Sequence, residues 1–452
     1  MTRAASEAWH HPVTQVAVGL RIGATAEGHP VPDRPVGTLT LEGTRPVFVY
    51  DPAFLADPLP LSPLQLPAHA GAFRHADPDF EHLPGLLADA LPDGWGRLLH
   101  DRAFARAGRA LDTVTALDRL AAVGHAAMGA LVFDPAIPLG VDTAHEAEAA
   151  FDLDAVAAQA QRLAAGGEEA VLPALQLGGG APGGARPKAL IGLRREADRV
   201  HCIAGVTPAM VRGEVHALPD DYAPWLVKFT SDEDRARFGP DVGAVEACYA
   251  VMARRAGLTV AETTLLIDAA GRRHFATARF DRVGPGGRQR VHVHTAGGLL
   301  HASFRVPSLD YTALFQLTRA LTRSPAQLRE LFRRMVFNVY AYNRDDHAKN
   351  FAFRMTADGT WTLAPAYDLM FSPGMHGRHA TSVDGVDDWP TRAGLLRLGE
   401  QHRLARQELE QDLARVREAV AAGPALAREW GCARSTCAML QARFEEIARR
   451  AE

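Results

Sequence analysis

Lysine and asparagine are scarce in this chain of 452 residues. Only three of its 49 cationic residues are lysines, at Lys188, Lys228 and Lys349. A lysine ammonium is a compact point charge, whereas an arginine guanidinium is a broad planar fork. The lysines therefore mark candidate sites that a guanidinium would not fit. All three asparagines fall within one stretch, residues 338–350, which becomes the first candidate site.

Cysteine is also scarce, and four cysteines in this length do not make a disulfide framework. Cys202 and Cys248 lie in apolar segments, and Cys432 and Cys437 lack the second pair that a zinc site requires. We therefore expect structural cysteines. The 19 histidines include no HExxH motif, so satisfied or solvated histidines are favoured over metal ligands.

The chain has no strong excess of charge and no long apolar run. Its formal net charge of −4 argues against a basic nucleic-acid surface over the whole protein. No apolar run approaches the length that spans a bilayer, and residues 1–15 lack the apolar centre of a signal peptide. We expect a cytoplasmic protein with no membrane partner.

The length predicts two or three domains. Residues 1–15 are an expected flexible arm, and residues 16–150 alternate apolar and polar residues before helical runs, which predicts an α+β accessory domain. Residues 151–283 predict strands on both sides of a glycine-rich turn, forming a kinase N-lobe. Residues 284–452 predict a helical C-lobe that carries an acidic loop. The expected fold is therefore α+β, with the two lobes of the protein kinases behind an additional N-terminal domain.

The stretch that holds the asparagines carries the arrangement that phosphoryl transfer needs. Asp345 and Asn350 are five residues apart, and Asp368 follows a short polar hairpin. A kinase uses one carboxylate for the acceptor hydroxyl, and an amide with a second carboxylate for Mg²⁺. Asp345 is thus a candidate catalytic residue, and Asn350 and Asp368 are candidate Mg²⁺ ligands. Lys349 could offset charge on the transferring phosphoryl group.

The alternative is a solvated turn in which aspartate and asparagine serve as caps. The D-x₄-N spacing, followed by an aspartate behind an apolar strand, favours the kinase interpretation. Asp346 is a second carboxylate beside Asp345, and only the five-residue step to Asn350 favours Asp345.

Lys228 lies among apolar residues in PWLVKFT, where an unpaired ammonium would cost about 2–5 kcal/mol. ATP phosphates or Glu246 could supply the anionic partner, and a lysine snorkelling from an edge strand is the alternative.

Residues 178–188 match G-x-G-x-x-G but lack the Gly-Lys-Ser/Thr of a Walker A loop. Pro187 and a β-like run follow where a dinucleotide-binding helix should open. We favour a flexible cover whose backbone N–H groups approach phosphates, with Lys188 behind it.

Several motifs occur together and in a familiar order: GGARPKA, LVKF, RFDR, DDHAKNF and AYDL. In the N-terminal half, YDPAFL, PLSPLQLP, PGLLADALPDGWGR and LDRLAAVGHAAMGAL accompany them. From about Val16 to about Arg443 the chain resembles the HipA family, the serine/threonine kinase toxins of bacterial toxin–antitoxin pairs. No short motif is specific alone, but the combination is.

The resemblance implies roles for individual residues. Asp345 would be the catalytic base, while Asn350 and Asp368 would bind Mg²⁺. Ala278 to Phe280 would form the inter-lobe strand whose backbone meets adenine, and His347 to Asn350 would lie against the nucleotide. The implied contacts to ATP phosphates are Lys228 and the phosphate-loop residues Gly183, Gly184, Ala185, Arg186 and Lys188.

The resemblance also implies partners. The family pairs with a small helix-turn-helix antitoxin, so a HipB-like protein is expected here, with operator DNA bound only through it. Well-known members phosphorylate an aminoacyl-tRNA synthetase, which implies a protein substrate and a toxin. Two alternatives stay open: a catalytically idle kinase fold acting as a regulatory module, and a small-molecule kinase. The complete set of Lys228, Asp345, Asn350 and Asp368 argues against an idle fold.

One departure from the family concerns control of activity. Where well-studied toxins carry an autophosphorylated serine in the glycine-rich loop, this chain has Ala181 or Pro182. Residues 178–188 contain no serine or threonine. We therefore expect restraint to come from a partner or from another site.

Overall fold

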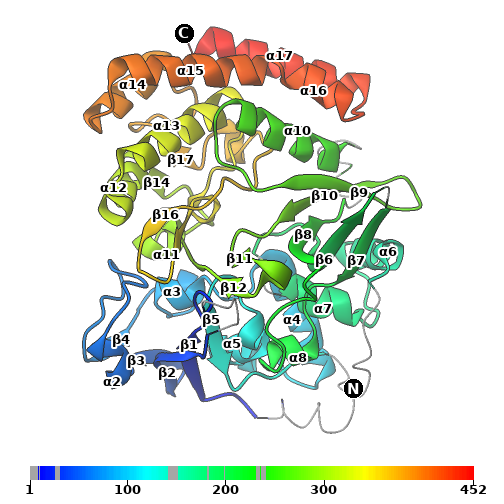
Figure 1. Ribbon diagram of the computed structural model, residues 1–452, viewed down its shortest axis with the longest axis vertical. Coiled ribbons are helices and arrows are strands. Elements are labelled where there is room, and N and C mark those ends of the chain that lie inside the picture. The colour runs from blue at the N-terminus through cyan, green and yellow to red at the C-terminus, as the bar shows by residue number, and fades with distance from the viewer. Residues whose placement is uncertain are drawn as a thin grey trace. The chain divides into compact units, whose positions relative to one another are not determined.

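The computed structural model describes residues 9, 11–25, 31–140, 151–180, 183–197, 199–230, 235 and 241–451. The chain forms two compact units and passes between them more than once (Figure 1). Unit 1 comprises Met1–Glu233, Ile267–His294 and Met355–Gly359. Unit 2 comprises Asp234–Leu266, Thr295–Arg354 and Thr360–Glu452. The mixture of helices and sheets confirms the predicted α+β class.

Unit 1 begins with a five-stranded antiparallel sheet in the order β4-β3-β2-β1-β5. The alternation read from the sequence explains the first strand, because Val16 and Val18 are buried while Gln15 and Ala17 are exposed. One face of this sheet thus covers a core. The strands are β1 (Gln15–Leu20), β2 (Arg34–Glu42), β3 (Arg45–Tyr50), β4 (Ala72–Arg74) and β5 (Leu131–Asp134).

Helices connect β3, β4 and β5 of this sheet. The last of them, α5, starts with a capping box in which Thr115 and Asp118 each bind the backbone N–H of the other. Asp118 is fully buried and also accepts a hydrogen bond from the Val13 N–H (2.8 Å), so the same carboxylate ties the start of the chain to the helix. The helices are α2 (Pro52–Ala56), α3 (Gly85–Ala88), α4 (Gly94–Arg106) and α5 (Ala116–Val123).

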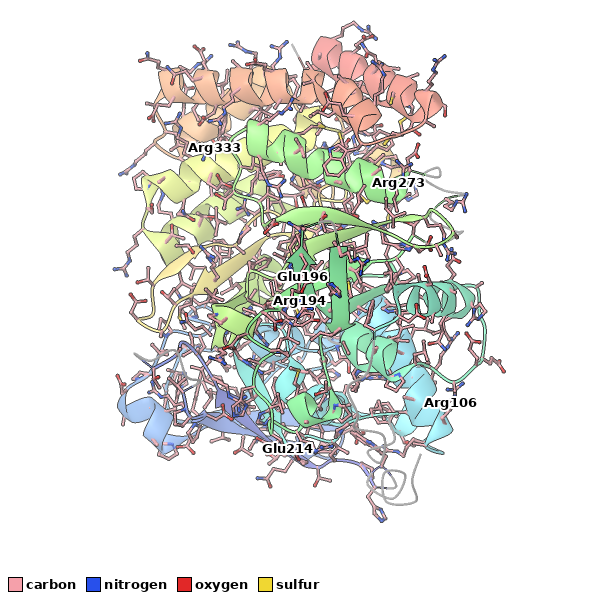
Figure 2. The ribbon with its side chains drawn as sticks, turned by 45° about the vertical axis from the view of Figure 1, so that its right-hand side comes forward. Arg106, Arg194, Glu196, Glu214, Arg273 and Arg333 are labelled. Atoms are coloured by element: carbon pink, nitrogen blue, oxygen red, sulfur yellow. The ribbon has the colours of Figure 1, made fainter. Side chains whose placement is uncertain are left out.

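A second antiparallel sheet in unit 1 has the strand order β7-β6-β8-β10. Most of β6 is buried, and only its C-terminal end reaches solvent, where the labelled Arg194 and Glu196 pair at 3.0 Å (Figure 2). The strands are β6 (Lys188–Glu196), β7 (Arg199–Ala204), β8 (Ala223–Lys228) and β10 (Arg273–Ala278). The other elements of this part are α6 (Leu153–Ala164), α8 (Pro208–Val211), β11 (Arg282–Val283) and β12 (Gln289–Arg290).

The segment before the glycine-rich turn is a helix, α7 (Pro173–Gly180), and not the strand expected from the sequence. A Cβ on Gly179 would lie 2.6 Å from Leu99 Cδ1 and 2.8 Å from the Lys188 carbonyl oxygen. Glycine at this position therefore lets α7 approach α4 and β6 closely. Gly178 and Gly179 serve helix packing, which shortens the predicted phosphate loop.

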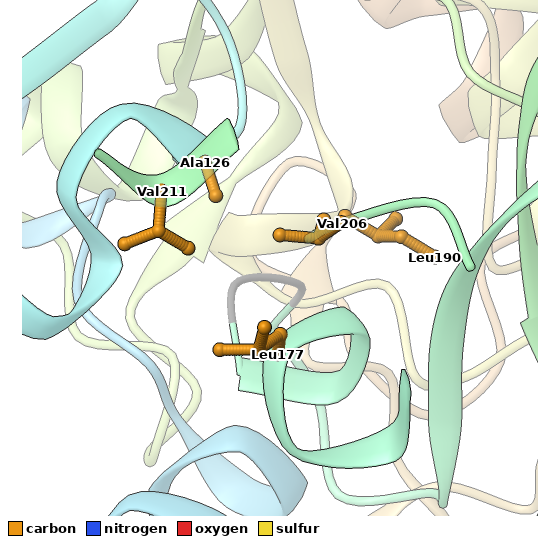
Figure 3. Close-up of a cluster of buried hydrophobic side chains, with 5 residues drawn as sticks. All are labelled: Ala126, Leu177, Leu190, Val206 and Val211. Carbon is orange, nitrogen blue, oxygen red and sulfur yellow. The ribbon is translucent and has the colours of Figure 1, made fainter. Parts of the chain in front are cut away.

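A hydrophobic cluster joins the first 140 residues to the second sheet. Figure 3 shows its five buried side chains, which come from α7, α8, β6, the 3₁₀ helix Gly124–Ala126 and the segment after β7. Replacing Leu190, which is 1 % exposed, by alanine would cost about 2–5 kcal/mol. Unit 1 is therefore one packed body that includes both sheets. The cluster consists of Ala126, Leu177, Leu190, Val206 and Val211.

Unit 2 is mainly helical, as predicted. The central helix α13 (Pro325–Tyr340) packs against α12 and α15, and α10 packs against α15 and α16. In Figure 1 the orange and red C-terminal helices form one layer of this unit. The other helices are α10 (Val242–Arg255), α11 (Ala296–Leu300), α12 (Tyr311–Thr322), α14 (Arg392–Gln401), α15 (Arg406–Ala421), α16 (Gly423–Glu429) and α17 (Arg434–Arg450).

Short strands complete the fold. Within unit 2, β14 (Leu309–Asp310) pairs in parallel with β17 (Thr381–Ser382), and β15 neighbours β16 (Trp361–Leu363). The strands β9 (Thr263–Ile267), β13 (His292–Thr295) and β15 (Ala352–Met355) lie where the chain changes unit.

All four cysteines are free thiols, which confirms that the chain has no disulfide framework. Three of them are buried, as expected for structural residues. Within the described ranges, no helix has the length and apolar character needed to cross a membrane.

Candidate active site

The loop that follows α13 presents two adjacent carboxylates in opposite environments. Asp345 is exposed, whereas Asp346 is 1 % exposed. The sequence could separate the two only by spacing. Burial separates them physically, because an exposed carboxylate can meet a substrate and a buried one cannot.

Asp346 is surrounded by hydrogen-bond donors. Its Oδ1 accepts the backbone N–H groups of Ala380 (2.9 Å) and Thr381 (3.2 Å). Its Oδ2 accepts the Tyr311 hydroxyl (3.2 Å) and lies 3.0 Å from His379 Nδ1. A buried carboxylate with four partners fixes the backbone on either side of it, so Asp346 positions Asp345.

Two of the three asparagines extend this network. The Asn343 Nδ2 group donates to Asn338 Oδ1 at 2.9 Å, and Asn338 Nδ2 donates to the Tyr311 hydroxyl oxygen at 2.9 Å. Because Tyr311 donates onward to Asp346, the chain of bonds runs from the end of α13 to the start of the acidic loop. Asn338 and Asn343 are thus structural residues of the helix side.

The third asparagine closes the loop. Asn350 Nδ2 donates to the Asp345 carbonyl oxygen (2.7 Å), and the Asn350 N–H donates to the His347 carbonyl oxygen (2.8 Å). The first bond fixes the amide plane, so Oδ1 is left as an acceptor. The Lys349 Nζ lies 4.3 Å above the ring of Phe304, and His347 packs on the same ring at 5.8 Å. These contacts hold the Lys349 and His347 side chains against one aromatic side chain.

Asp368 reaches the same loop through its neighbour. The Tyr367 hydroxyl donates to the Lys349 carbonyl oxygen. Upstream, the buried Arg334 Nη2 donates to the Ala364 carbonyl oxygen at 2.6 Å. Asp368 itself is half-buried and has a φ of 54°, a left-handed conformation that aspartate tolerates better than most residues. The segment that carries Asp368 is therefore held against residues 345–350.

Two side chains in this part of unit 2 are of the chemical kind that Mg²⁺ prefers as ligands. Asn350 Oδ1 and the Asp368 carboxylate are hard oxygen donors, and Mg²⁺ usually takes only one or two carboxylates beside phosphates and water. No group of three or more His, Cys, Asp or Glu side chains in the described part of the chain is arranged to hold a metal ion. A phosphate-bound Mg²⁺ matches such a sparse ligand set better than a structural metal does.

The candidate residues of unit 1 centre on two buried lysines. Lys188 at the start of β6 lies directly opposite Lys228 at the end of β8, so both side chains project from the same face of the sheet. They are 4 % and 7 % exposed. The Lys228 Nζ also lies 5.8 Å from the ring of Phe275 on the next strand. Two lysines at paired positions of neighbouring strands place two positive charges on one face of the sheet.

The glycine-rich loop rests on the start of α4. The Gly184 N–H donates to Asp93 Oδ1, and the Gly184 carbonyl oxygen accepts the Trp95 N–H at 3.0 Å. Trp95 Nε1 donates to the Lys188 carbonyl oxygen at 3.0 Å, and Lys188 Nζ donates to the Gly183 carbonyl oxygen. A backbone N–H of the predicted phosphate loop is thus occupied by a carboxylate. Residues 181 and 182, where the sequence departs from the family, lie outside the described residues.

The other unit 1 candidates surround this sheet. Ala278 ends β10 opposite Trp225, and Phe280, two residues on, is half-buried. Ala185 is exposed, and Arg186 is half-buried. The structure thus brings Gly183, Gly184 and Lys188 together with Lys228 in unit 1, and Asp345, Lys349 and Asn350 together with Asp368 in unit 2.

Several residues of these sites escaped the sequence analysis. Tyr367 stands beside the predicted Asp368, so its position was a usable signal. The Asp93–Gly184 bond joins residues 91 positions apart, and no local pattern reports such a contact. The residues missed are Asp93, Trp95, Phe304, Tyr311, Tyr367 and His379.

The sequence matches two family profiles that together cover both predicted halves. Residues 31–134 match the HipA N-terminal domain, and residues 180–423 match the HipA-like C-terminal domain. The second match alone covers more than half of the chain. The two sheets, the helical unit and the acidic loop thus define a two-part kinase-like fold. The chain belongs to the HipA family.

One solved structure agrees with the fold over nearly the whole chain. HipA of Shewanella oneidensis MR-1, from a structure of a toxin–antitoxin system with HipB and operator DNA, is similar with a TM-score of 0.63 and 17 % identity. The match covers 96 % of each chain. The Helicobacter pylori proinflammatory kinase CtkA matches 52 % of this chain and 90 % of its own, with 12 % identity and a TM-score of 0.36. A search of curated proteins gave no match.

Proposed function

We propose that the protein is an ATP- and Mg²⁺-dependent serine/threonine protein kinase of the HipA type. The observation that carries the proposal is the contrast between Asp345, exposed on a loop closed by Asn350, and Asp346, buried beneath it with four partners. A rigid loop that offers one carboxylate to solvent suits general-base catalysis on a hydroxyl.

The residues divide the chemistry among them. Asp345 accepts the proton of the acceptor hydroxyl, and Lys188 with Lys228 attracts the phosphates of ATP. Lys349, which Phe304 holds in place, offsets charge on the transferring group. Asn350 and Asp368 would hold Mg²⁺, which neutralises phosphate charge when bound. The main contribution of the protein is positioning and charge, as phosphoryl transfer requires.

Transfer of radiolabelled phosphate from ATP in a cell lysate tests this proposal. Asp345→Ala should lower labelling of a protein band by about 10²- to 10⁴-fold, since it removes the base. Asp57→Ala removes another exposed carboxylate and is the matched control. Label in small molecules would identify a small-molecule kinase, and equal labelling by wild type and Asp345→Ala would identify an idle fold.

Nucleotide binding separates the metal ligands from the base. Asp368→Ala should abolish Mg²⁺-dependent ATP binding, because it leaves the metal one amide ligand from the protein. Asp345→Ala should bind ATP as wild type does. Isothermal titration with and without Mg²⁺ measures both, and unchanged binding by Asp368→Ala would contradict the assigned role.

The toxin role rests on family membership and on the Shewanella neighbour, whose structure contains HipB and operator DNA. By this proposal the partner is a small helix-turn-helix antitoxin that carries the protein to its operator, and the substrate is a translation factor such as an aminoacyl-tRNA synthetase. Growth with and without the neighbouring antitoxin gene tests toxicity. Phosphorylation of purified synthetases tests the substrate, and growth unaffected by the active kinase would contradict the toxin role.

Control of activity differs from that in relatives with a serine in the glycine-rich loop. Because residues 178–188 lack serine and threonine, loop phosphorylation cannot silence this kinase, and a partner or another site must restrain it. The bond from Gly184 to Asp93 is one contact that ATP phosphates would compete with. Mass spectrometry and activity after incubation with Mg-ATP test this, and an inactive autophosphorylated form would contradict it.

A further inference from the structure

A small cavity in unit 1, lined by residues other than the two lysines, has several arginines in its lining. It has a volume of about 40 Å³, enough for more than one water molecule. Arg279, Arg282 and Arg290 line it together with His216. Apolar residues also line it, and two of them, Ala126 and Val206, belong to the cluster in Figure 3.

The backbone brings two of these arginines together. Arg282 on β11 lies directly opposite Arg290 on β12, so both side chains leave the same face of the hairpin. The hairpin tip contains Gly286, whose φ is +60° and whose Cβ would lie 2.1 Å from the Leu218 carbonyl oxygen. Glycine therefore allows the tip to dock, which closes the cavity around two like charges.

Another arginine, Arg21, lies against the lining residue His216, and three of the four arginines are already paired with aspartates. Arg279 binds Asp281 through Nε (2.9 Å) and Nη2 (2.7 Å), and Arg21 binds Asp33 through two bonds of 2.6 Å. Arg282 donates to Asp281 Oδ2 at 2.8 Å and to three backbone carbonyl oxygens. Two aspartates therefore serve three of the four guanidinium groups.

Arg290 is the fourth, and it is 5 % exposed. Its Nη2 donates to the His125 carbonyl oxygen. Its Nε and Nη1 are buried without a hydrogen-bond partner among the residues that the structure describes. Burial, followed by Arg282 and Arg21, lowers the pKa of Arg290 well below its ordinary value, and burial also lowers the pKa of Arg282 to about 9. The cavity thus holds donors and positive charge without enough acceptors.

A histidine adds a donor at the rim. Arg21 Nη1 lies 2.8 Å from His216 Nδ1, and an arginine can only donate. His216 therefore accepts at Nδ1 and carries its proton on Nε2 when neutral. By the same reasoning His125 accepts from Arg21 (3.1 Å) and gives its Nε2 proton to Asp134 (3.1 Å). The rim thus offers an N–H group from His216.

We propose that this cavity binds a phosphate-type oxyanion, held by the Nε–H and Nη1–H of Arg290 with His216 Nε2–H at the rim. Four arginines against Asp33 and Asp281 leave a net charge of +2, which a phosphate dianion balances. Asp134 is not included in this charge count, because it is more than half exposed and is the hydrogen-bond partner of His125. Because apolar residues also line the cavity, the test compares free phosphate with a phosphomonoester. Nothing in this site depends on the kinase reaction.

Thermal unfolding and titration calorimetry of the full chain test the site with inorganic phosphate, against chloride at matched ionic strength. Arg290→Met should weaken phosphate binding by about 10- to 100-fold, because it removes two hydrogen bonds to a charged group. The variant should also fold, since an apolar side chain of similar length replaces a buried surplus charge. Arg288→Met, on the same hairpin and paired with Asp220, is the matched control and should bind phosphate normally.

Two further variants keep the test decisive. Lys228→Met removes the phosphate contact proposed for ATP, so phosphate binding that survives in Lys228→Met and fails in Arg290→Met belongs to the arginine cavity. His216→Asn changes an exposed rim residue and should weaken binding by a few-fold, on the order of one hydrogen bond, even if Arg290→Met does not fold. Equal binding by wild type, Arg290→Met and His216→Asn, or no effect of phosphate beyond chloride, overturns the proposal. Tighter binding of O-phosphoserine than of phosphate assigns a monoester, and weaker or equal binding assigns the free ion.

Discussion

Unit 2 surrounds its buried carboxylate with donors, whereas unit 1 buries more guanidinium groups than its carboxylates can pair. Asp346 has four partners from two separate segments, and Arg290 has one partner for its three kinds of N–H group. A complete network fixes a loop in place, and an incomplete one marks where a ligand can supply what is missing. The buried carboxylate of Asp346 therefore fixes a loop, whereas the buried guanidinium of Arg290 marks a place where a ligand can bind.

Removing Asp346 should break the comparison most strongly. Asp346→Ala leaves buried donors on Tyr311, His379 and two backbone N–H groups, so the free energy of unfolding should fall by about 3–5 kcal/mol. Asp345→Ala removes an exposed carboxylate and should change it by no more than about 0.5 kcal/mol. Urea denaturation measures both. Equal losses for the two variants would show that Asp346 does not position the loop.

Acid should weaken unit 1 through histidines held neutral in its interior. Burial lowers the pKa of His100 and of His292 to about 3. Between that value and the ordinary pKa of 6.5, the unfolded chain binds protons that the folded chain excludes, so stability falls as the pH falls. The loss from pH 7 to pH 5 should be about 2 kcal/mol for each histidine.

Denaturation at pH 7, 6 and 5 measures this loss, and His100→Leu should remove one histidine's share of it. Because His100 lies in unit 1, this variant assigns its share of the pH dependence of stability to unit 1 and not to unit 2. A pH dependence unchanged by His100→Leu would mean that other groups take up the protons.

Loss of the Tyr311 hydroxyl should have a smaller effect within unit 2. Tyr311→Phe breaks the link between Asn338 and Asp346 but leaves the carboxylate its other three partners, so we expect a loss of about 1–3 kcal/mol. The kinase rate should fall as well, because the loop that carries Asp345 loses one support. Denaturation and phosphate transfer measured on the same preparation check both effects. If Tyr311→Phe lost as much unfolding free energy as Asp346→Ala, the expected order of the two effects would be wrong.

Local patterns predicted much of the fold. The alternation of apolar and polar residues predicted strands β1, β2 and β3, and amphipathic runs predicted helix α13 and the C-terminal helices. The triple glycine at Gly178 misled the prediction, because glycine here permits close helix packing rather than a turn. A glycine in a single sequence shows that the backbone has conformational freedom, but it does not show which other elements pack closely against that backbone.

The candidate sites show the same limit. Spacing selected Asp345, Asn350 and Asp368, yet it could not show that Asp346 is buried or that Tyr367 ties the two segments together. The pairing of Lys188 with Lys228, and of Arg282 with Arg290, depends on strand register, which no short motif contains.

The contacts around Trp95 have a consequence for how this gene can be divided. Trp95 and Asp93 bind Lys188 and Gly184, and Ala126 packs beneath Leu190, so residues before 140 complete the core of the second sheet. A gene fragment that starts at residue 151 would encode every proposed catalytic group and still expose the apolar side of β6. The first 140 residues and the rest of the chain should therefore be inherited together. A recombinant of two related genes would need both partners of each of these contacts from the same parent.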